Sequence, residues 1–386
     1  MAKRNVLFVV DEKQMGGVSV LLSDILKKIN LKKYNVDIMV LHNNGEYLDD
    51  LPKGVNMIYG TSFFDTIDYT LKEVIKSGNL RNIFYRLYII FLMKTMLIGN
   101  KIKKERKKCI KKKYDIEIAF KDGFCALFTA YGDSKKKYHW LHTDYSMYDC
   151  TGNYHKLFEK VFCEFDKIIG ISNSVLDRFL EKYQVNNVDV IYNLINEDEI
   201  ISKANKDDIK YDEKINLISV GRIHNMKGYD RLIKVMNKLN IDNLLDDVVL
   251  RIIGDGPDFH LIKSLVKEYK LEDKVILMGR MRNPFPYVKA SDSFLMCSRY
   301  EPFGLVVLEA MVLGVPVIST DVASIREIMD EKYGMIIDNC EDGLYKGIKR
   351  VINDNKLLME YKKNLSKFKY DVDDIIVKIE RLLDEV

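Results

Sequence analysis

Short apolar runs alternate with longer amphipathic segments along the chain, in two successive series. Continuous apolar runs predict buried strands, and apolar positions that recur every three or four residues predict helices between them. The strands expected in the first series are 6–10, 36–41, 115–120, 137–142, 167–171 and 189–192. Those expected in the second series are 215–220, 248–253, 275–278, 293–297, 315–319 and 335–337. This alternation predicts an α/β fold with parallel sheets covered by helices on both faces.

The length of the chain indicates that the two series belong to two domains. A chain of 386 residues exceeds what one ordinary hydrophobic core holds, so two domains are expected. The polar segment 193–214 separates the two series and is predicted to be the linker. The expected domains are therefore 1–195 and 196–370, each with its own sheet.

Composition narrows the class of protein. With 47% hydrophobic and 31% charged residues, the chain is typical of a folded soluble protein. A net charge of +4 gives no case for nucleic-acid binding. The six cysteines are scattered without a CxxC pair, which argues against zinc or a disulfide scaffold and fits a reducing cytoplasm. The apolar run at Val6–Val10 ends at Asp11 and is too short for a secretory signal.

Residues 81–113 interrupt the alternation. An aromatic and apolar segment, Ile83–Ile98, precedes a basic cluster in which Glu105 is the single acid among nine Lys and Arg residues. The apolar segment is too short and too charged to predict a transmembrane span. Two interpretations stay open: a helix that lies in an anionic membrane surface, or a core-packed helix followed by a solvated basic one. No recognition motif supports nucleic-acid binding.

The most informative stretch is 298–320, between two predicted strands. Glu301 lies in the turn that begins it, and Glu309 lies on the following helix in an otherwise apolar segment. Buried carboxylates without partners cost several kcal/mol, so these two acids are expected to bind something. A strand, a glycine-containing turn and a helix N-terminus form a typical anion site, which together with the acids suggests a sugar nucleotide. The alternative is a helix-terminal acid and a core salt bridge.

Turns after neighbouring strands carry further candidates. Arg222 and Lys227 follow the first strand of the second series, at the same sheet edge as Glu301, and two such cations suit a diphosphate. The turn Gly254-Asp-Gly-Pro lacks the third glycine of a dinucleotide fingerprint, so it either admits a ligand close to its backbone or only turns the chain. Arg280 and Met281 follow the next strand and could form the wall of a nucleobase site.

The first series offers two weaker candidates. Gly16 and Gly17 follow the first strand, where their amides could approach a phosphate or sugar, or form a plain tight turn. His142 lies just past a strand end, a functional location in open α/β sheets, with a structural role as the alternative. The motif Asp371-Val-Asp373 is similar to a metal-binding DxD, but acids before a helix are normally caps, so no metal is expected.

Taken together, the motifs Gly221-Arg, Lys227-Gly, Gly254-Asp-Gly-Pro and the Ser298–Thr320 stretch resemble glycosyltransferase family 4, the group 1 glycosyltransferases. The resemblance includes the pair of glutamates separated by seven residues, here Glu301 and Glu309, and covers about 215–340 specifically. It implies the GT-B fold, two Rossmann-like domains with parallel sheets facing across a cleft. It also implies that 371–386 returns to the first domain as a helix.

The resemblance assigns roles to single residues. Arg222 and Lys227 would bind the donor diphosphate with helix amides near Gly304 and Leu305, Glu309 the ribose, and Glu301 the transferred sugar. The catalytic residues it implies are Glu301, His142, Arg222 and Lys227. The donor-binding residues expected in total are Gly16, Gly17, Arg222, Lys227, Gly254, Arg280, Met281, Glu301, Phe303, Gly304, Leu305 and Glu309.

The function expected from the resemblance is retaining, metal-independent transfer of a sugar from a nucleotide sugar, with UDP favoured over GDP. The acceptor would be a glycan or a polyprenyl-linked glycan of cell-envelope, capsular or exopolysaccharide biosynthesis, bound by the N-terminal domain. No cofactor is expected beyond the nucleotide-sugar co-substrate. The expected location is the cytoplasm, on the cytoplasmic face of the membrane if 81–113 binds lipid. A sugar-nucleotide 2-epimerase and a non-catalytic glycosyltransferase partner subunit are the alternatives.

Overall fold

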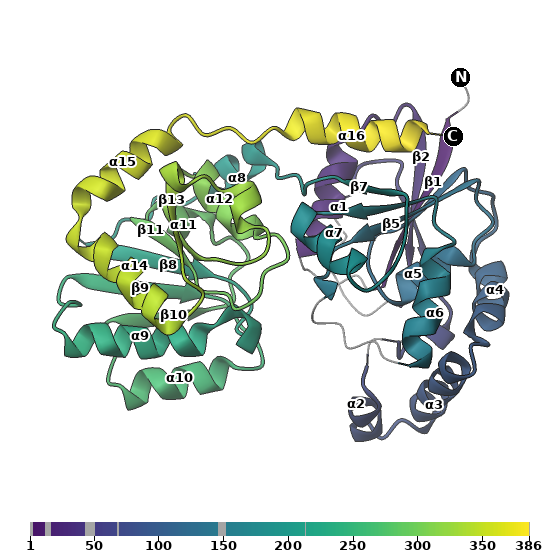
Figure 1. The fold of residues 1–386 in the computed structure, drawn as a ribbon, viewed down its shortest axis with the longest axis horizontal. Coiled ribbons are helices and arrows are strands. Elements are labelled where there is room, and N and C mark those ends of the chain that lie inside the picture. Colours follow the sequence, from purple (N-terminus) through teal and green to yellow (C-terminus); the bar gives the residue numbers. More distant parts are fainter. Residues whose placement is uncertain are drawn as a thin grey trace. The chain divides into compact units, whose positions relative to one another are not determined.

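The computed structural model describes residues 3–11, 17–42, 51–67, 69–145, 152–212 and 214–385. The chain forms two compact units, which are described separately. Unit 1 comprises Met1–Leu194 together with Val372–Val386, and unit 2 comprises Ile195–Asp371. Each unit has a parallel sheet flanked by helices (Figure 1).

The sheet of unit 1 has seven parallel strands in the order β3-β2-β1-β4-β5-β6-β7. Its strands are β1 Arg4–Val10, β2 Tyr34–Val40, β3 Asn56–Tyr59, β4 Ile116–Ala119, β5 Lys136–Leu141, β6 Lys167–Gly170 and β7 Val188–Val190. Its described helices are α1 Gly17–Lys28, α2 Leu71–Lys76, α3 Leu80–Lys94, α4 Ile98–Cys109, α5 Phe124–Ala130, α6 Asn153–Phe162, α7 Asn173–Leu180 and α16 Val372–Asp384, besides the short 3-10 helix η1 Ser62–Phe64.

The sheet of unit 2 has six parallel strands in the order β10-β9-β8-β11-β12-β13. Its strands are β8 Ile215–Val220, β9 Val248–Ile253, β10 Val275–Gly279, β11 Ser293–Met296, β12 Val317–Thr320 and β13 Gly334–Ile337. Its described α-helices are α8 Glu197–Ala204, α9 Tyr229–Ile241, α10 Phe259–Glu268, α11 Phe285–Lys289, α12 Leu305–Val312, α13 Ile325–Ile328, α14 Glu341–Asn353 and α15 Asn355–Leu365, and its 3-10 helices are η3 Asn225–Lys227 and η4 Glu331–Tyr333.

Continuous apolar strands form the two cores. In unit 1, residues 6–9 of β1 are fully buried, and the Phe120 and Trp140 rings meet edge to face 5.1 Å apart. In unit 2, Leu217, Leu250 and Leu295 of neighbouring strands belong to one buried cluster. Burial on both faces explains why these strands are apolar throughout rather than alternating. Because the strands of each sheet are parallel, all their carboxyl ends lie at one edge of the sheet, where ligands of such sheets bind.

The C-terminal helix α16 packs on unit 1. Ile379, Leu382 and Leu383 are buried there. The Glu380 carboxylate accepts hydrogen bonds from the Asn30 amide at 2.8 Å and from Lys33 at 3.1 Å. The last helix of the chain is therefore part of the fold of its first unit.

Among the differences from the sequence predictions, three concern β3, the linker and β12. β3 was not predicted, because this edge strand is half exposed and lacks a continuous apolar run. The predicted linker 193–214 contains α8, which Asn196 caps through the Glu199 amide and which packs against α11 and α12. The linker prediction was wrong for these residues, because a polar sequence can still form a capped surface helix. β12 begins at Val317, two residues later than predicted.

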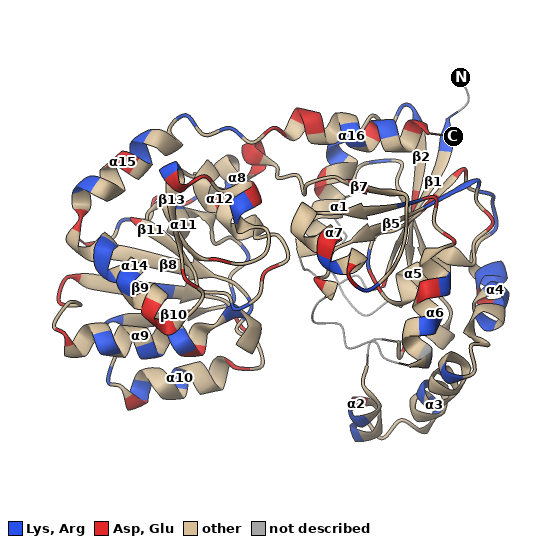
Figure 2. Ribbon diagram, viewed as in Figure 1, with Lys and Arg blue, Asp and Glu red and all other residues tan. Residues whose placement is uncertain are grey.

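The segment 81–113 forms α3 and α4. Ile89, Leu92 and Met93 bury one face of α3. Lys and Arg residues are frequent along α4 (Figure 2). No helix among the described residues is long and apolar enough to cross a bilayer.

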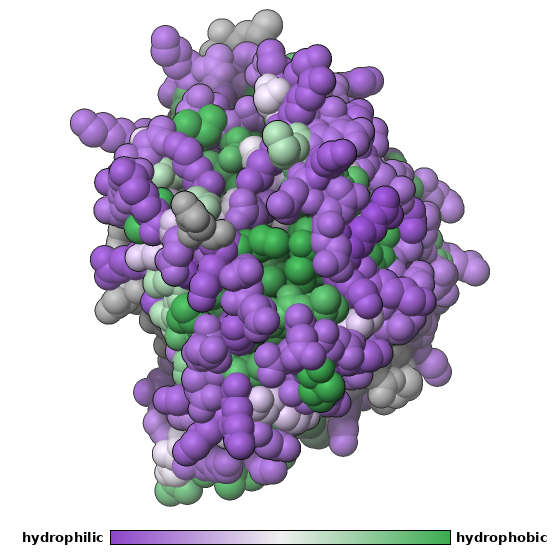
Figure 3. All heavy atoms as spheres, turned by 90° about the vertical axis from the view of Figure 1, so that its left-hand side faces the viewer, coloured by the Kyte–Doolittle hydropathy of each residue, from purple (hydrophilic) through white to green (hydrophobic). Residues whose placement is uncertain are grey.

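Viewed from the side that lies on the left of Figure 1, the surface is mostly hydrophilic, with hydrophobic residues gathered near its middle (Figure 3).

Candidate functional site

The candidate site lies at the carboxyl edge of the unit 2 sheet and begins with the loop after β8. Ile223 anchors this loop in the core with no exposed surface. The loop then forms η3 and reaches α9 through Gly228, whose φ of +72° lies in the left-handed region. Lys227, the last residue of η3, is therefore held immediately before a helix N-terminus.

Backbone segments of adjacent loops touch at positions where glycine leaves room. A Cβ atom on Gly228 would lie 2.2 Å from the carbonyl oxygen of Cys297, at the end of β11. A Cβ atom on Gly254 would lie 1.9 Å from the carbonyl oxygen of Gly221. The loops after β8, β9 and β11 thus pack backbone against backbone, which any larger residue at these glycines would prevent.

Arg299 fixes the loop after β11 on the loop after β8. Its guanidinium makes two parallel hydrogen bonds to the Asp230 carboxylate, of 2.6 and 2.7 Å, and a third to the Asn225 carbonyl at 2.8 Å. Its backbone amide donates to the Met226 carbonyl at 2.8 Å. The hydrogen bonds from Arg299 hold the pKa of Asp230 below its usual range. Because this bidentate pair fixes the loop, it also fixes the position of Glu301, two residues further on.

A second arginine, Arg231, supports the same junction from inside. It is buried and donates to the Cys297 carbonyl at 2.7 Å and to the Asn339 side-chain oxygen at 2.6 Å. The Cys297 thiol donates to the Lys227 carbonyl at 3.1 Å, and burial raises the pKa of this thiol to about 12. Cys297 is therefore a protonated structural donor, not a nucleophile.

Besides the Arg299–Asp230 pair, the ionisable side chains at this edge include a second ion pair and an exposed cation. The Lys227 ammonium and the Glu301 carboxylate form a hydrogen-bonded ion pair. Arg222 is exposed and makes no hydrogen bond or ion pair with any residue that the structure describes. Glu309 is half-buried on α12. Lys227 is thus engaged with an acid, while Arg222 is available to a ligand.

The N-terminus of α12 lies beside this pair. Gly304 caps the helix with a φ of +92°, no side chain among the described residues accepts from its first amides, and its first turn contains no acid. A Cβ atom on Gly304 would lie 3.6 Å from the Glu301 Cγ atom, so the glycine is needed for its backbone conformation rather than for space. An uncapped helix N-terminus beside a lysine–glutamate pair favours an anion.

The structure brings together most of the predicted donor-site residues. Those at the carboxyl edge of the unit 2 sheet, on the loops after β8, β9 and β11 and on α12, are Arg222, Lys227, Gly254, Glu301, Phe303, Gly304, Leu305 and Glu309. Arg280 and Met281 follow β10, at the end of the sheet's strand order. Phe303 is buried and supports the loop, since its carbonyl accepts from the Ser324 hydroxyl at 3.0 Å.

The remaining predicted site residues belong to unit 1. Gly17 is the first residue of α1, and Gly16 lies outside the described residues. His142 follows β5 and is buried, with its ring 4.8 Å from that of Phe120. Burial lowers the pKa of His142 to about 3, although the Asp122 carboxylate opposes this effect. Its Nε2 atom has no hydrogen-bond partner among the described residues, so the imidazole is a neutral group with an unused polar atom.

Sequence analysis missed the residues that position the site. Arg299 lies in the 298–320 stretch but was not predicted to have a role, and neither were Asp230, Arg231 and Asn339. Their partners lie 66 to 108 residues away along the chain, so no local pattern distinguishes them from surface charges. The partial signal was that Asp230 and Arg231 open the helix directly after the Lys227-Gly228 motif.

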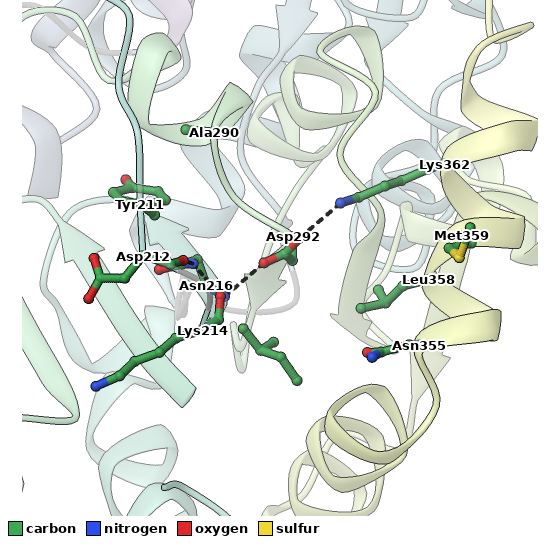
Figure 4. A pocket seen from close by; sticks show the side chains of 11 residues that line it. Tyr211, Asp212, Lys214, Asn216, Ala290, Asp292, Asn355, Leu358, Met359 and Lys362 are labelled. Carbon is green, nitrogen blue, oxygen red and sulfur yellow. Dashed lines mark hydrogen bonds and ion pairs between the residues drawn. The ribbon is translucent and has the colours of Figure 1, made fainter. Parts of the chain in front are cut away.

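Unit 2 also contains a cavity of about 480 Å³ at the other edge of its sheet. Figure 4 shows Asn216 beside Asp292, whose carboxylate also binds Lys362 of α15 at 2.9 Å. Asn216 and Asp292 lie at the amino ends of β8 and β11. None of the predicted donor-site residues lines this cavity, so it is separate from the candidate site.

Comparison with known proteins shows which family and which fold the chain is similar to. Residues 201–368, nearly all of unit 2, match the family model described as glycosyl transferases group 1. The solved structure of Anabaena HepE in complex with UDP and glucose matches with a TM-score of 0.70 at 16% identity, covering 99% of this chain and 100% of that one. TarM matches with a TM-score of 0.73 at 15% identity, covering 99% of each chain. Residues 201–368 are thus similar to the group 1 glycosyltransferases, and the chain has the GT-B fold, as the sequence predicted.

Sequence relatives share about half of their length with this chain. One is the Campylobacter jejuni N-acetylgalactosamine-N,N'-diacetylbacillosaminyl-diphospho-undecaprenol 4-alpha-N-acetylgalactosaminyltransferase, 29% identical over 53% of this chain and 56% of the relative. Another is the Bacillus anthracis N-acetyl-alpha-D-glucosaminyl L-malate synthase, 32% identical over 47% of this chain and 48% of the relative. The chain thus spans only part of each relative that it matches.

The glycine contact at Gly228 gives a first prediction. G228A should lower the free energy of unfolding by at least about 2 kcal/mol, because it adds a clash with Cys297 to the cost of the left-handed conformation. The matched control is G314A, since Gly314 has a φ of +74° but no atom within 4 Å of an added Cβ, and should cost about 1 kcal/mol. Denaturant unfolding measures both. Equal losses would mean that the loops do not depend on this contact.

The buried imidazole gives a second prediction. Folding lowers the pKa of His142 from an ordinary 6.5 to about 3, so between these values the unfolded chain binds more protons than the folded one. Stability should therefore be fully present above about pH 6.5 and fall as the pH drops towards 3, by up to about 1.4 kcal/mol per pH unit.

Thermal unfolding of H142N across this pH range tests the assignment, because asparagine does not titrate. The variant should lose part of the acid sensitivity, whereas H260N, at an exposed histidine, should keep it. An unchanged pH profile in H142N would show that other groups dominate the acid response.

Proposed function

We propose that this chain is a retaining glycosyltransferase that moves a sugar from a UDP-sugar to a lipid-linked glycan acceptor in cell-envelope polysaccharide biosynthesis. The observation that carries the proposal is the combination of Arg222, the Lys227–Glu301 pair and the uncapped α12 N-terminus at one sheet edge. It supplies positive charge for a diphosphate and a carboxylate for sugar hydroxyls in one place. The match of residues 201–368 to the group 1 glycosyltransferases supports the same reaction class.

The leaving diphosphate is assigned to Arg222, Lys227 and the first amides of α12. When the bond from the sugar to the β-phosphate breaks, negative charge develops on the diphosphate, and preorganised donors stabilise it without reorganisation. We therefore propose that the leaving diphosphate is stabilised without a metal ion. UDP is favoured over GDP because HepE, which shares the fold, was solved with UDP.

The Lys227–Glu301 ion pair suggests how the donor is recognised. A bound β-phosphate competes with the Glu301 carboxylate for the Lys227 ammonium. When the phosphate displaces Glu301, Lys227 pairs with the leaving group instead. The Glu301 carboxylate then becomes available as an acceptor for hydroxyl groups of the transferred sugar. Glu309, half-buried on α12, is assigned to the ribose, which also presents hydroxyl donors.

Unit 1 is assigned the acceptor. His142 suits a position near the reacting sugar because a neutral imidazole with an unused Nε2 atom can exchange hydrogen bonds with hydroxyls without adding a charge. Gly16 and Gly17 keep the donor-binding role expected from the sequence, with their backbone amides near a phosphate or sugar. A polyprenyl diphosphate carrier is part of the proposal because the Campylobacter relative acts on a diphospho-undecaprenol-linked acceptor. A location on the cytoplasmic face of the membrane is proposed together with this carrier.

Calorimetry and transfer assays test the proposal. The protein should bind a UDP-sugar more tightly than the matching GDP-sugar, and transfer to a lipid-linked acceptor should continue in EDTA with the donor's anomeric configuration retained in the product. K227A should lower kcat/KM by about a hundredfold to a thousandfold, because a preorganised donor to the leaving group is lost. K234A, at an exposed lysine of α9, is the control and should leave kcat/KM unchanged.

Each failure has a distinct meaning. Absence of binding to any UDP- or GDP-sugar would contradict the enzymatic proposal. Conversion of the UDP-sugar without an acceptor would favour an epimerase. Near-normal turnover in K227A would remove the assigned role of Lys227, and loss of activity in EDTA would contradict metal independence.

A further inference from the structure

The outward face of α3 is apolar. Leu80, Phe84, Leu87 and Phe91 are exposed to 80%, 65%, 49% and 56% of their surface. At about 100° per residue, these four positions fall within an arc of about 60° on one side of the helix. Large side chains aligned in this way form a continuous stripe rather than the scattered exposed apolar residues of an ordinary surface.

The opposite face of α3 is fixed to unit 1, so the stripe cannot be turned inward. Ile89, Leu92 and Met93 are buried on that face. The Arg86 guanidinium donates to the carbonyl oxygens of Thr66 and Ile67 at 3.2 and 3.0 Å. Apolar residues on both faces explain why the sequence was compatible with a core-packed helix and with a surface-binding helix.

Positive charge is concentrated next to the stripe. Residues 79–113 contain twelve Lys and Arg residues against Glu105, a net charge of +11, so the rest of the chain carries −7. Glu105 already binds Lys101 and Lys108. The cations of this segment that have no acidic partner among the described residues include Lys103, Lys104, Lys107 and Lys113.

Several of these cations share a hollow. A cavity of about 520 Å³ at the end of α4 is lined by Lys103, Lys107, Lys111 and Lys113, with Asp133 as its one acid. Arg106 also lines it, but this guanidinium is engaged with Glu117 at 2.8 Å. The unpaired lysines give the hollow a positive field suited to phosphate groups.

We propose that α3 and α4 form a docking surface for an anionic phospholipid bilayer. The Leu80–Phe91 stripe enters the interface between headgroups and acyl chains, and the lysines of α4 bind headgroup phosphates. Charge complementarity favours this occupant over a second copy of the chain, because pairing two such segments would bring like charges together. α3 lies in the interface and does not span it, since none of the described helices can cross a bilayer.

This inference concerns unit 1 alone and does not depend on the donor site. Binding to lipid would place unit 1 at the surface where a lipid-linked acceptor resides, which deepens the proposed function. The two can fail separately, because UDP binding is measured without lipid and vesicle binding without UDP.

Vesicle sedimentation tests the surface. The full chain should bind vesicles of phosphatidylglycerol and phosphatidylcholine at least about tenfold more strongly than pure phosphatidylcholine vesicles, and added salt should weaken the binding. F84S/F91S and, separately, K103Q/K104Q/K107Q/K113Q should each lower the binding by at least about tenfold. All substituted side chains are exposed, so both variants should keep the unfolding temperature and UDP affinity of the parent chain.

Matched controls replace comparable side chains elsewhere. M359S/V377S changes two other exposed apolar residues, and K263Q/K267Q/K356Q/K363Q changes four other exposed lysines, and neither should alter vesicle binding. Equal binding to both kinds of vesicle, or equal losses in the control variants, would overturn the proposal. Absence of vesicle binding together with a dimer that F84S/F91S dissociates would assign the stripe to a second copy instead.

Discussion

The candidate site depends on the contact between Gly228 and the carbonyl oxygen of Cys297. Because this position carries no Cβ, the start of α9 can lie directly against the end of β11, and the Cys297 carbonyl can accept from Arg231. Arg299 then ties the two loops together through Asp230 and Asn225. Lys227 and Glu301, which lie 74 residues apart in sequence, are brought together by this junction. The charged side chains are thus positioned by rigid backbone before any ligand binds, as electrostatic stabilisation of a leaving group requires.

The same junction divides the polar side chains of this region into buried ones and accessible ones. Arg231 and Cys297 are buried, satisfied by carbonyl oxygens, and unsuited to chemistry. Arg222 and the Lys227–Glu301 pair lie at the accessible sheet edge. Unit 1 shows a comparable division, with His142 kept neutral by burial while the unpaired lysines of α4 remain exposed. Both units therefore expose cations, and in unit 2 the buried groups hold the loops that carry them.

The sequence predicted the continuous strands best. β8 and β9 span the predicted residues because buried parallel strands are apolar throughout. The half-exposed β3 has no such run, and α8 is a polar capped helix, so neither element was predicted. In the site, motifs at strand ends located Arg222, Lys227 and Glu301, since parallel strands end at one edge. The Arg299–Asp230 clamp and the Lys227–Glu301 ion pair could not be predicted, because they join loops that are distant in sequence and meet only through the glycine contact.

The central claim is that a nucleoside diphosphate binds to the edge formed by the loops after β8 and β11. Hydrogen exchange of the full chain, followed by mass spectrometry with and without UDP, tests this claim most directly. Amides in residues 221–228 and 298–306 should exchange more slowly when UDP is bound. Slowed exchange confined to the Tyr211, Asn216 and Lys362 cavity, or no change anywhere at saturating UDP, would contradict the account.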